Sequence, residues 1–433
     1  MTRTLQQPMT SAFLARSPLA SSCWAVVAAF GAYFCTYAFR KPWTAAVFVD
    51  GTVWGVAEKN MLVASQILGY MLAKFAGIRV VAEMPPERRA LWIVALLAAA
   101  EVALVLFGAA PSPLHVAALF FNGLALGIVF GLVVGFLEGR RHTEALTAGL
   151  CASFILADGL CKSVGTWLLG LGVSERWMPA AAGLIFAFPS LLFVWMLGKI
   201  PPPDEADLAH RSERLPMTRA DRLAMLRRHG FGIMAVVAAY LWVTIARGIR
   251  ADFAPEIWKA MRVHVVPATF AKSEIFVALG VLLANGLSIL IVDNRRAFFG
   301  AIGVGLAGSL LMIAALAGRQ AGLIAPFPFM VLLGLGLYLP YVAIHTTIFE
   351  RLIAMTRDRS NLGFLLYVAD AAGYMAYASL VLAKGWLPVR ANPLHFFMNA
   401  WWVIGLMTLL SLIVGWAYFA SPSRRPAAEE ALA

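Results

Sequence analysis

Residues 21–49 have the sequence SSCWAVVAAFGAYFCTYAFRKPWTAAVFV, a long apolar stretch that contains an arginine and a lysine. About 20 apolar residues are enough for a helix to cross a bilayer, so Arg40 is predicted to lie inside a membrane. An ionisable residue there is costly and by default indicates a functional site. Farther along the chain, Tyr240 precedes Arg247 by the same spacing with which Tyr33 precedes Arg40. Two such arginines at matching positions predict a central site shared by two repeats.

The composition predicts an all-α membrane protein. Apolar residues make up 61% of the 433-residue chain and charged residues only 13%, which leaves too little polar surface for a soluble domain of this size. In the bilayer the backbone satisfies its hydrogen bonds within helices. We therefore expect twelve transmembrane helices. The expected segments are 21–49, 60–79, 90–110, 114–137, 145–171, 178–198, 230–254, 270–292, 297–317, 325–348, 361–384 and 396–420.

The basic residues predict the orientation of these helices. More than twice as many Lys and Arg residues of the polar segments fall on the side of the two termini as on the other side. Since basic loops stay inside, both termini are expected in the cytoplasm of a bacterial-type inner membrane. The net charge of +12 follows from this bias, so no nucleic-acid partner is expected. The first apolar stretch is also too long for the core of a cleavable signal peptide.

The chain divides into two similar halves. The polar segment 199–229 separates six predicted helices from six others, which gives an N-terminal bundle (1–198), a cytoplasmic linker loop (199–229) and a C-terminal bundle (230–433). Glu138 and Asp158 in the first half recur as Glu350 and Asp370 in the second half with the same spacing. The sequence therefore predicts two pseudo-symmetric six-helix bundles.

This plan resembles the major facilitator superfamily, in which two six-helix bundles face each other across a central cavity. A narrower resemblance lies in three short motifs, which are similar to those of the organophosphate:phosphate antiporters. They are Tyr37-Ala-Phe-Arg40-Lys41-Pro-Trp43, Tyr70-Met-Leu-Ala-Lys74-Phe75, and Arg247 followed by Asp252, Phe253 and Pro255. The stretches Tyr37 to Ala45 and Phe349-Glu350-Arg351-Leu-Ile are also similar to an uncharacterised facilitator-like family of unknown function.

The antiporter resemblance implies that Arg40 and Arg247 bind a phosphoryl group and that Lys74 adds positive potential. The residue chemistry agrees with this, because guanidinium groups bind phosphate or carboxylate oxygens bidentately and stay charged. On one continuous helix, Tyr33, Tyr37, Arg40 and Thr44 would share a face; Tyr240, Thr244 and Arg247 would do the same. We therefore expect the three tyrosines to line the substrate site. Lys41 points away from Arg40 on such a helix and is a weaker candidate for substrate binding. Alternatively, both arginines extend to the membrane interface.

Four further residues lie inside predicted helices and have two interpretations each. Asp158 and Lys162 are four residues apart, so they either neutralise each other as an ion pair or carry a proton and contact substrate. Asp370 has no partner nearby in sequence; it either titrates or faces a central arginine. His345 is either a packed, hydrogen-bonded side chain or a proton-coupling residue.

A gate is predicted at the cytoplasmic ends of the fourth and tenth helices. Each helix ends in a glutamate followed by arginine: Glu138 with Arg140, and Glu350 with Arg351. Gate salt bridges are the expected role of these residues, with substrate contacts as the alternative. The four cysteines fall in helices without CxxC pairing or a neighbouring histidine, so we expect neither disulfides nor a metal site.

The sequence thus predicts a secondary transporter rather than an enzyme. It contains no phosphate-binding glycine loop, HExxH or serine elbow, and no cofactor is expected. The expected partners are a small anionic substrate, phosphorylated by resemblance, and the lipid bilayer; the protein is expected to be a monomer. Coupling is either exchange against inorganic phosphate, which the resemblance implies, or proton coupling through Asp370 or Asp158. Two other functions stay open: a membrane sensor that binds without transporting, and a flippase for lipid or glycan intermediates.

Overall fold

The computed structural model describes residues 18–48, 51–137, 143–201, 219–289, 291, 293–356, 362–386 and 393–421. Helices make up most of this part of the chain. The N-terminal group consists of α2 (Pro18–Thr36), the 3-10 turns η1 (Tyr37–Phe39) and η2 (Pro42–Ala45), the hairpin strands β1 (Thr52–Val53) and β2 (Val56–Ala57), α3 (Glu58–Glu83), α4 (Pro86–Ala109), α5 (Leu114–Leu126), α6 (Val129–Leu137), α7 (Thr143–Gly170) and α8 (Met178–Gly198). The C-terminal group consists of α10 (Arg219–Asp252), α11 (Ala254–Ala260), α12 (Pro267–Ile289), α13 (Asn294–Gln320), α14 (Pro326–Ala343), the π-helical turn η3 (Ile344–Ile348), α15 (Phe349–Thr356), α16 (Leu362–Trp386) and α17 (Pro393–Ala420).

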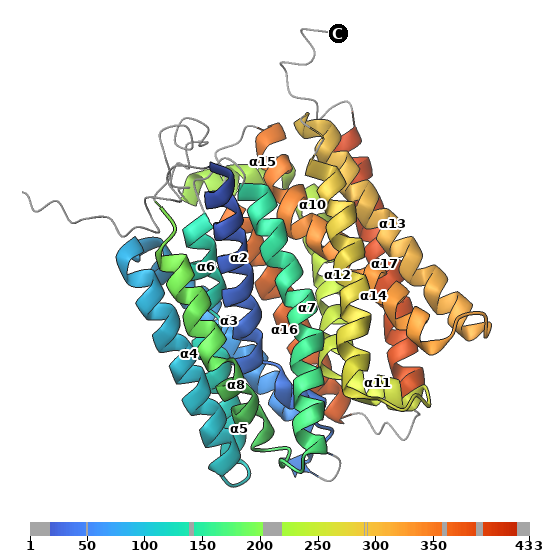
Figure 1. Cartoon of the computed structure of the whole chain (residues 1–433). Helices are drawn as coiled ribbons and strands as arrows, with labels where there is room; N and C mark the ends of the chain where they lie inside the picture. The colour runs from blue at the N-terminus through green and yellow to red at the C-terminus, as the bar shows by residue number, and fades with distance from the viewer. Residues whose placement is uncertain are drawn as a thin grey trace, which may run out of the picture.

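The two groups lie side by side, with the long helices running in the same general direction (Figure 1). They meet along two helix pairs, α3 with α16 and α7 with α12. The short helix α11 lies at one end of the molecule and α15 at the other (Figure 1). We refer to these as the α11 end and the α15 end.

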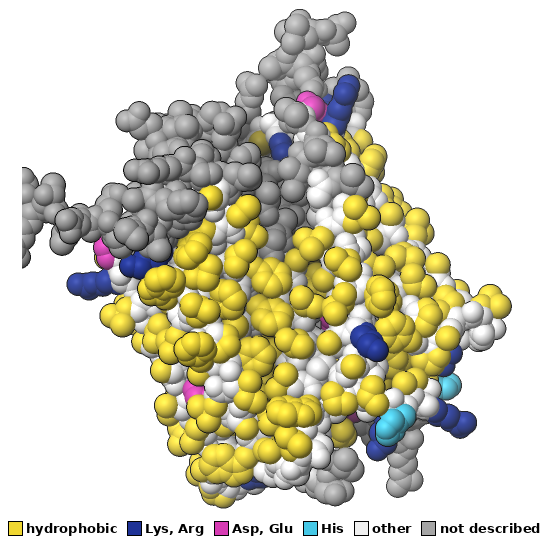
Figure 2. All heavy atoms as spheres, viewed as in Figure 1, with side chains coloured by type: hydrophobic (Ala, Val, Ile, Leu, Met, Phe, Trp, Pro, Cys, Tyr) yellow, Lys and Arg dark blue, Asp and Glu magenta, His cyan; other side chains and the backbone are white. Residues whose placement is uncertain are grey.

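Nine helical segments of the described chain are long and apolar enough to cross a membrane. Figure 2 shows hydrophobic side chains over the middle of the surface, while most of the Lys and Arg side chains in this view lie toward the two ends. The chain is therefore a multi-pass membrane protein. Three further long helices, α3, α7 and α16, are not among the nine. All three take part in the contacts between the two groups, and they contain Lys74, Asp158, Lys162 and Asp370.

The first predicted helix is interrupted where Arg40 lies, which corrects the expectation of a continuous helix over 21–49. Helix α2 ends at Thr36, and Arg40 lies between η1 and η2. The reason is Pro42, which has no backbone N–H to donate to the carbonyl oxygen of Ala38 and whose ring would clash with that carbonyl in a continuous helix. Tyr33, Tyr37, Arg40 and Thr44 therefore do not form one helical stripe. In the second half α10 is continuous, and it begins at Arg219, inside the predicted linker segment.

Two amide side chains hold this interruption in place. Gln66 Nε2 donates to the carbonyl oxygen of Arg40 at 3.0 Å, and Asn122 Nδ2 donates to that of Phe39 at 2.9 Å. The two amides are joined to each other by a hydrogen bond of 2.8 Å. Non-helical backbone at membrane depth requires such partners because lipid supplies none. Helices α3 and α5 thus fix the position of Arg40.

Helices α3 and α5 reach this arrangement because glycines let their backbones approach closely. A Cβ atom on Gly123 would overlap the backbone oxygen of Gln66, and one on Gly69 would overlap that of Phe120. Small residues serve this purpose at helix contacts in membranes. The glycines are therefore a condition for the Gln66 and Asn122 hydrogen bonds.

We predict that Gly123→Val destabilises the fold by about 1–3 kcal/mol, because the added side chain forces the α3 and α5 backbones apart. Thermal unfolding of the purified protein measures this. Gly230→Val is the matched control, since a Cβ at Gly230 in α10 meets no atom within 4 Å. Equal unfolding midpoints for the two variants would contradict the close approach.

Candidate functional site

A small cavity lies at the centre of the molecule and is lined from both groups of helices. Its volume is about 20 Å³, room for about one water molecule. Both predicted arginines, Arg40 and Arg247, line it. The complete lining is Tyr37, Arg40, Lys41, Ile67, Phe154, Asp158, Thr244, Arg247, Gly248, Ala251, Asp252, Tyr338, Tyr374 and Tyr377.

Arg40 is held between tyrosine rings rather than at the membrane interface. Its side chain is buried, with a relative exposure of 5%. The guanidinium carbon lies 4.0 Å from the centre of the Tyr70 ring and 5.8 Å from that of Tyr37. The Nε atom is buried without a hydrogen-bond partner. Extension to the interface, the alternative in the sequence analysis, does not occur for this residue.

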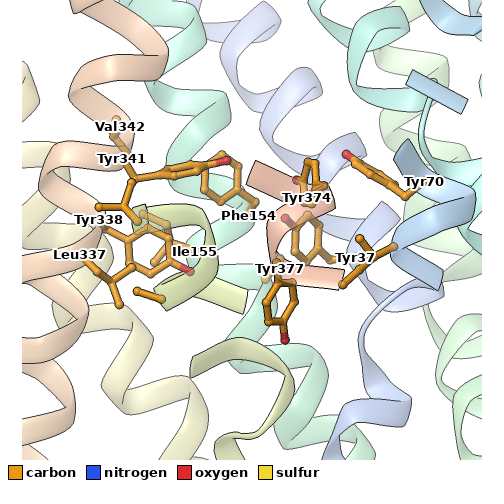
Figure 3. Packing of buried hydrophobic residues seen from close by; sticks show 14 of the residues in the cluster. Tyr37, Tyr70, Phe154, Ile155, Leu337, Tyr338, Tyr341, Val342, Tyr374 and Tyr377 are labelled. Atoms are coloured by element: carbon orange, nitrogen blue, oxygen red, sulfur yellow. The ribbon is translucent and has the colours of Figure 1, made fainter. Parts of the chain in front are cut away.

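Arg247 has a similar aromatic environment from the C-terminal group. Its Nη2 atom donates to the Tyr374 hydroxyl at 3.0 Å, and its guanidinium carbon lies 4.7 Å from the centre of the Tyr341 ring. The rings of Tyr70 and Tyr374 meet edge to face, with centres 5.5 Å apart. Figure 3 shows this pair with Tyr37 beside it. Tyrosine rings therefore connect the two arginines across the boundary between α3 and α16.

Most other buried cations near the cavity are neutralised by carboxylates. In the part of the chain that the structure describes, Arg40 and Arg247 have no carboxylate within ion-pair distance, whereas five other cations each have one. The pairs are Lys41–Asp252, Lys59–Glu256 (2.5 Å), Lys74–Asp370, Lys162–Asp158 and Arg250–Glu274 (2.6 Å). The two guanidinium groups thus carry the uncompensated positive charge of the described site.

Three of these ion pairs join the two groups of helices. Lys41–Asp252 and Lys59–Glu256 lie on the α11 side of the arginines, and Lys74–Asp370 lies on the α15 side. Arg247 is about 7 Å from Asp252 along the α10 axis, at the helical rise of 1.5 Å per residue. Arg40 and Arg247 thus lie between two sets of ion pairs that connect the two groups of helices.

Asp370 is the centre of the link on the α15 side. Besides Lys74 it accepts a hydrogen bond of 2.5 Å from the Tyr240 hydroxyl, which also lies 3.3 Å from His345 Nδ1. His345 belongs to the π-helical turn η3 and stacks on Tyr341, with ring centres 5.9 Å apart. Since π-turns often mark functional sites, this network is a candidate for proton coupling. Asp370 faces Lys74 instead of an arginine.

The remaining predicted residues have varied positions. Tyr33 is buried behind Tyr37, with ring centres 5.6 Å apart, and does not line the cavity. Asp158 and Lys162 form the predicted ion pair within α7. Of the predicted gate, Glu138 and Arg140 lie outside the described residues.

Within the C-terminal group, Arg351 Nη1 donates to Asn294 Oδ1 at 2.8 Å, a link between α15 and α13. Glu350 is half-buried in α15. The bond to Asn294 does not reach the N-terminal group, and a gate made of these residues stays a prediction.

Sequence reasoning missed the aromatic wall of the cavity. Tyr338 and Tyr341 lie on α14, and Tyr374 and Tyr377 lie on α16, each pair at a spacing of three residues. This spacing puts both members of a pair on one helix face and could have indicated a tyrosine-lined surface. Glu256 and Glu274, which neutralise Lys59 and Arg250, had no comparable signal because their partners are distant in sequence.

Comparison with known proteins identifies the fold and the family. The crystal structure of a D-xylose-proton symporter matches with a TM-score of 0.62 and 17% sequence identity, covering 93% of this chain and 98% of that chain. At this identity the likeness shows the major facilitator fold and no more. Comparison with curated proteins gives no match, and nothing here supports the narrower antiporter resemblance. A family model matches residues 42–422, most of the chain. The chain therefore belongs to a family of unknown function (DUF5690).

Proposed function

We propose that this protein is a secondary transporter that moves a small organic anion across the membrane by alternating access. The observation that carries the proposal is the pair of guanidinium groups, Arg40 and Arg247, that line one central cavity from the two groups of helices without a carboxylate partner. Arg40 and Arg247 occupy matching positions in the two halves of the sequence. The fold of a proton symporter supports a transport role and not an enzymatic one.

The substrate is proposed to be doubly charged, and phosphorylated compounds are favoured. Buried charges without partners are unfavourable, and an anion that bridges both guanidinium groups removes this cost. A phosphate monoester presents three oxygens and close to two negative charges near neutral pH, which matches two guanidinium forks. Bound between Arg40 and Arg247, it would draw the two groups of helices together.

The proposed transport cycle uses the inter-group ion pairs as gates. A cavity of about 20 Å³ is smaller than any organic substrate, so the links on one side of the arginines must separate for entry. Lys41–Asp252 and Lys59–Glu256 would open toward the α11 end, and Lys74–Asp370 toward the α15 end. In this proposal α3, α7 and α16 also cross the membrane, which gives twelve helices in two bundles (1–198 and 230–433).

The orientation and location are part of the same proposal. In this proposal both termini and the α15 end face the cytoplasm of a bacterial-type inner membrane, as the bias of the basic residues predicts. The protein acts as a monomer in this scheme, because each chain supplies both arginines of its own site.

Two coupling mechanisms fit this site. Exchange against inorganic phosphate follows only from the resemblance of the arginine motifs. Proton coupling is supported by a specific observation, the contacts of Asp370 with Lys74, Tyr240 and, through Tyr240, His345. Protonation of Asp370 would release Lys74 and weaken the link between α3 and α16. Substrate uptake into vesicles with an imposed pH gradient distinguishes the two mechanisms.

We predict that a phosphate or organophosphate ligand stabilises the purified protein by about 2.7 kcal/mol at a hundredfold excess over its dissociation constant. Thermal unfolding with a panel of anions measures this, and counterflow in proteoliposomes then tests transport. Stabilisation with counterflow supports the transporter. Stabilisation without counterflow would favour the sensor, and the absence of any effect in a folded protein would contradict the anion site.

A further inference from the structure

Four buried polar atoms without a hydrogen-bond partner line the central cavity. They are Arg40 Nε, Arg247 Nε, Asp158 Oδ1 and Thr244 Oγ1. A buried polar group that stays unpaired is costly, so each one in a folded protein requires an explanation. Arg40 Nε and Arg247 Nε belong to the proposed anion clamp. Asp158 Oδ1 and Thr244 Oγ1 are not cationic donors and therefore require a different explanation. The oxygens of a fully ionised phosphate monoester cannot satisfy Asp158 Oδ1, because both groups are acceptors.

Asp158 is firmly placed at the cavity wall. The residue is buried, with a relative exposure of 4%, and its other oxygen, Oδ2, accepts from the ammonium group of Lys162 one turn away on α7. Helix α12 packs directly against the next residue: a Cβ atom on Gly159 would overlap the Glu274 side chain. In addition, the Ala271 backbone N–H donates to Ser163 Oγ at 3.2 Å. This packing leaves Oδ1 as an acceptor at the cavity with no protein donor.

Two of the tyrosine hydroxyls that line the cavity are already engaged. Tyr377 donates to Asp252 Oδ2 at 2.9 Å, and the Tyr374 hydroxyl accepts from Arg247 at 3.0 Å. Neither hydroxyl contacts Asp158. Thr244 lies on α10, the helix of Arg247, and its hydroxyl is buried without a partner. Asp158 Oδ1 and Thr244 Oγ1 are therefore buried polar atoms of residues in the described cavity wall that stay open for a ligand beside the arginines.

We propose that Asp158 and Thr244 form a second subsite that recognises a hydrogen-bond donor on the anion. This inference rests on the proposed function and narrows its substrate class: the ligand carries a hydroxyl or ammonium group in addition to its anionic group. Alkyl phosphates without a donor leave Asp158 Oδ1 unpaired when they exclude water from the cavity. Sites built to bind a donor discriminate strongly against analogues that lack it.

Matched pairs of phosphate probes test the subsite in the purified full-length protein by titration calorimetry. One pair is n-propyl phosphate and glycerol 3-phosphate, which differ in hydroxyl groups; the other is ethyl phosphate and 2-aminoethyl phosphate, which differ in an ammonium group. We expect the donor-bearing member of at least one pair to bind about 10- to 100-fold more tightly. The pair that shows the preference identifies the donor as hydroxyl or ammonium.

Two variants connect the preference to the subsite. Asp158→Ala with Lys162→Met removes both charges of the ion pair together, so no buried ammonium is left unpaired, and it should abolish the preference. Thr244→Val keeps the side-chain shape and should reduce the preference even where the double variant does not fold. Arg296→Ala, at the exposed start of α13, should leave it unchanged.

The outcomes separate this inference from the proposed function. Equal binding of both members of each pair in the unaltered protein would overturn the donor subsite while the anion clamp stands. A preference that survives in both variants would also overturn it. No binding of any phosphate probe would overturn the phosphorylated substrate of the proposed function, and the subsite with it.

Discussion

Arg40→Ala and Arg247→Ala are each expected to weaken binding of the substrate anion by about 100-fold or more and to abolish transport. Truncating one partner of a buried, hydrogen-bonded charge pair costs about 2–5 kcal/mol, and about 3 kcal/mol corresponds to roughly 100-fold in affinity. Both side chains lie in one cavity without a carboxylate partner among the described residues. Calorimetric titration with the stabilising anion and counterflow in proteoliposomes measure the two effects.

The arginine replacements should leave the fold intact. Removing a buried charge that has no counter-charge relieves an unfavourable burial, so the unfolding temperature without ligand should not fall. Arg40→Lys tests geometry separately from charge, because an ammonium group cannot form the bidentate fork; partial binding is expected. Arg296→Ala is the control for loss of one positive charge at an exposed position. Full ligand stabilisation in Arg40→Ala or Arg247→Ala would disprove the clamp.

Lys74→Met and Asp370→Asn are each expected to destabilise the protein by about 3–5 kcal/mol, because each leaves the other side chain of a buried ion pair without its partner. The effect should appear as a lower midpoint of thermal unfolding. Transport should fail in both variants as well, since the pair is the link between α3 and α16 on the α15 side of the arginines. Lys199→Met, at the end of α8 and outside the described ion pairs, is the matched control for the lysine.

The double variant Lys74→Met with Asp370→Asn separates stability from coupling. Its stability should recover much of the loss, because no buried charge is left unpaired, and the losses should therefore not add. Transport by the double variant should not depend on the pH gradient, since the carboxyl group that would carry the proton is absent. Additive losses of stability would show that the two side chains act independently, against the ion pair in the structure.

Local sequence patterns predicted the helical fold and the central arginines, including helices over the charged segments 60–79, 145–171 and 361–384, which correspond to α3, α7 and α16. The nine spans that meet the criteria of length and hydropathy are continuous apolar segments, which the bilayer makes helical whatever surrounds them. The charged residues of α3, α7 and α16 lower the mean hydropathy of these helices. The end of α2 at Thr36 was missed, although Pro42, which removes a backbone donor, is a local signal for a break. The interrupted backbone after Thr36 is stabilised by hydrogen bonds from Gln66 and Asn122, which come from other helices.

Hydropathy and repeat spacing are properties of the linear chain, so the sequence was enough to predict membrane-spanning helices, two similar halves and an arginine in each. Which charges remain uncompensated could be read only from the folded chain. Lys41 forms an ion pair with Asp252, and Lys74 forms one with Asp370, across the boundary between the two groups of helices. An ion pair depends on a distance of a few ångströms between side chains remote in sequence, and packing of α3 against α16 and of α7 against α12 sets that distance.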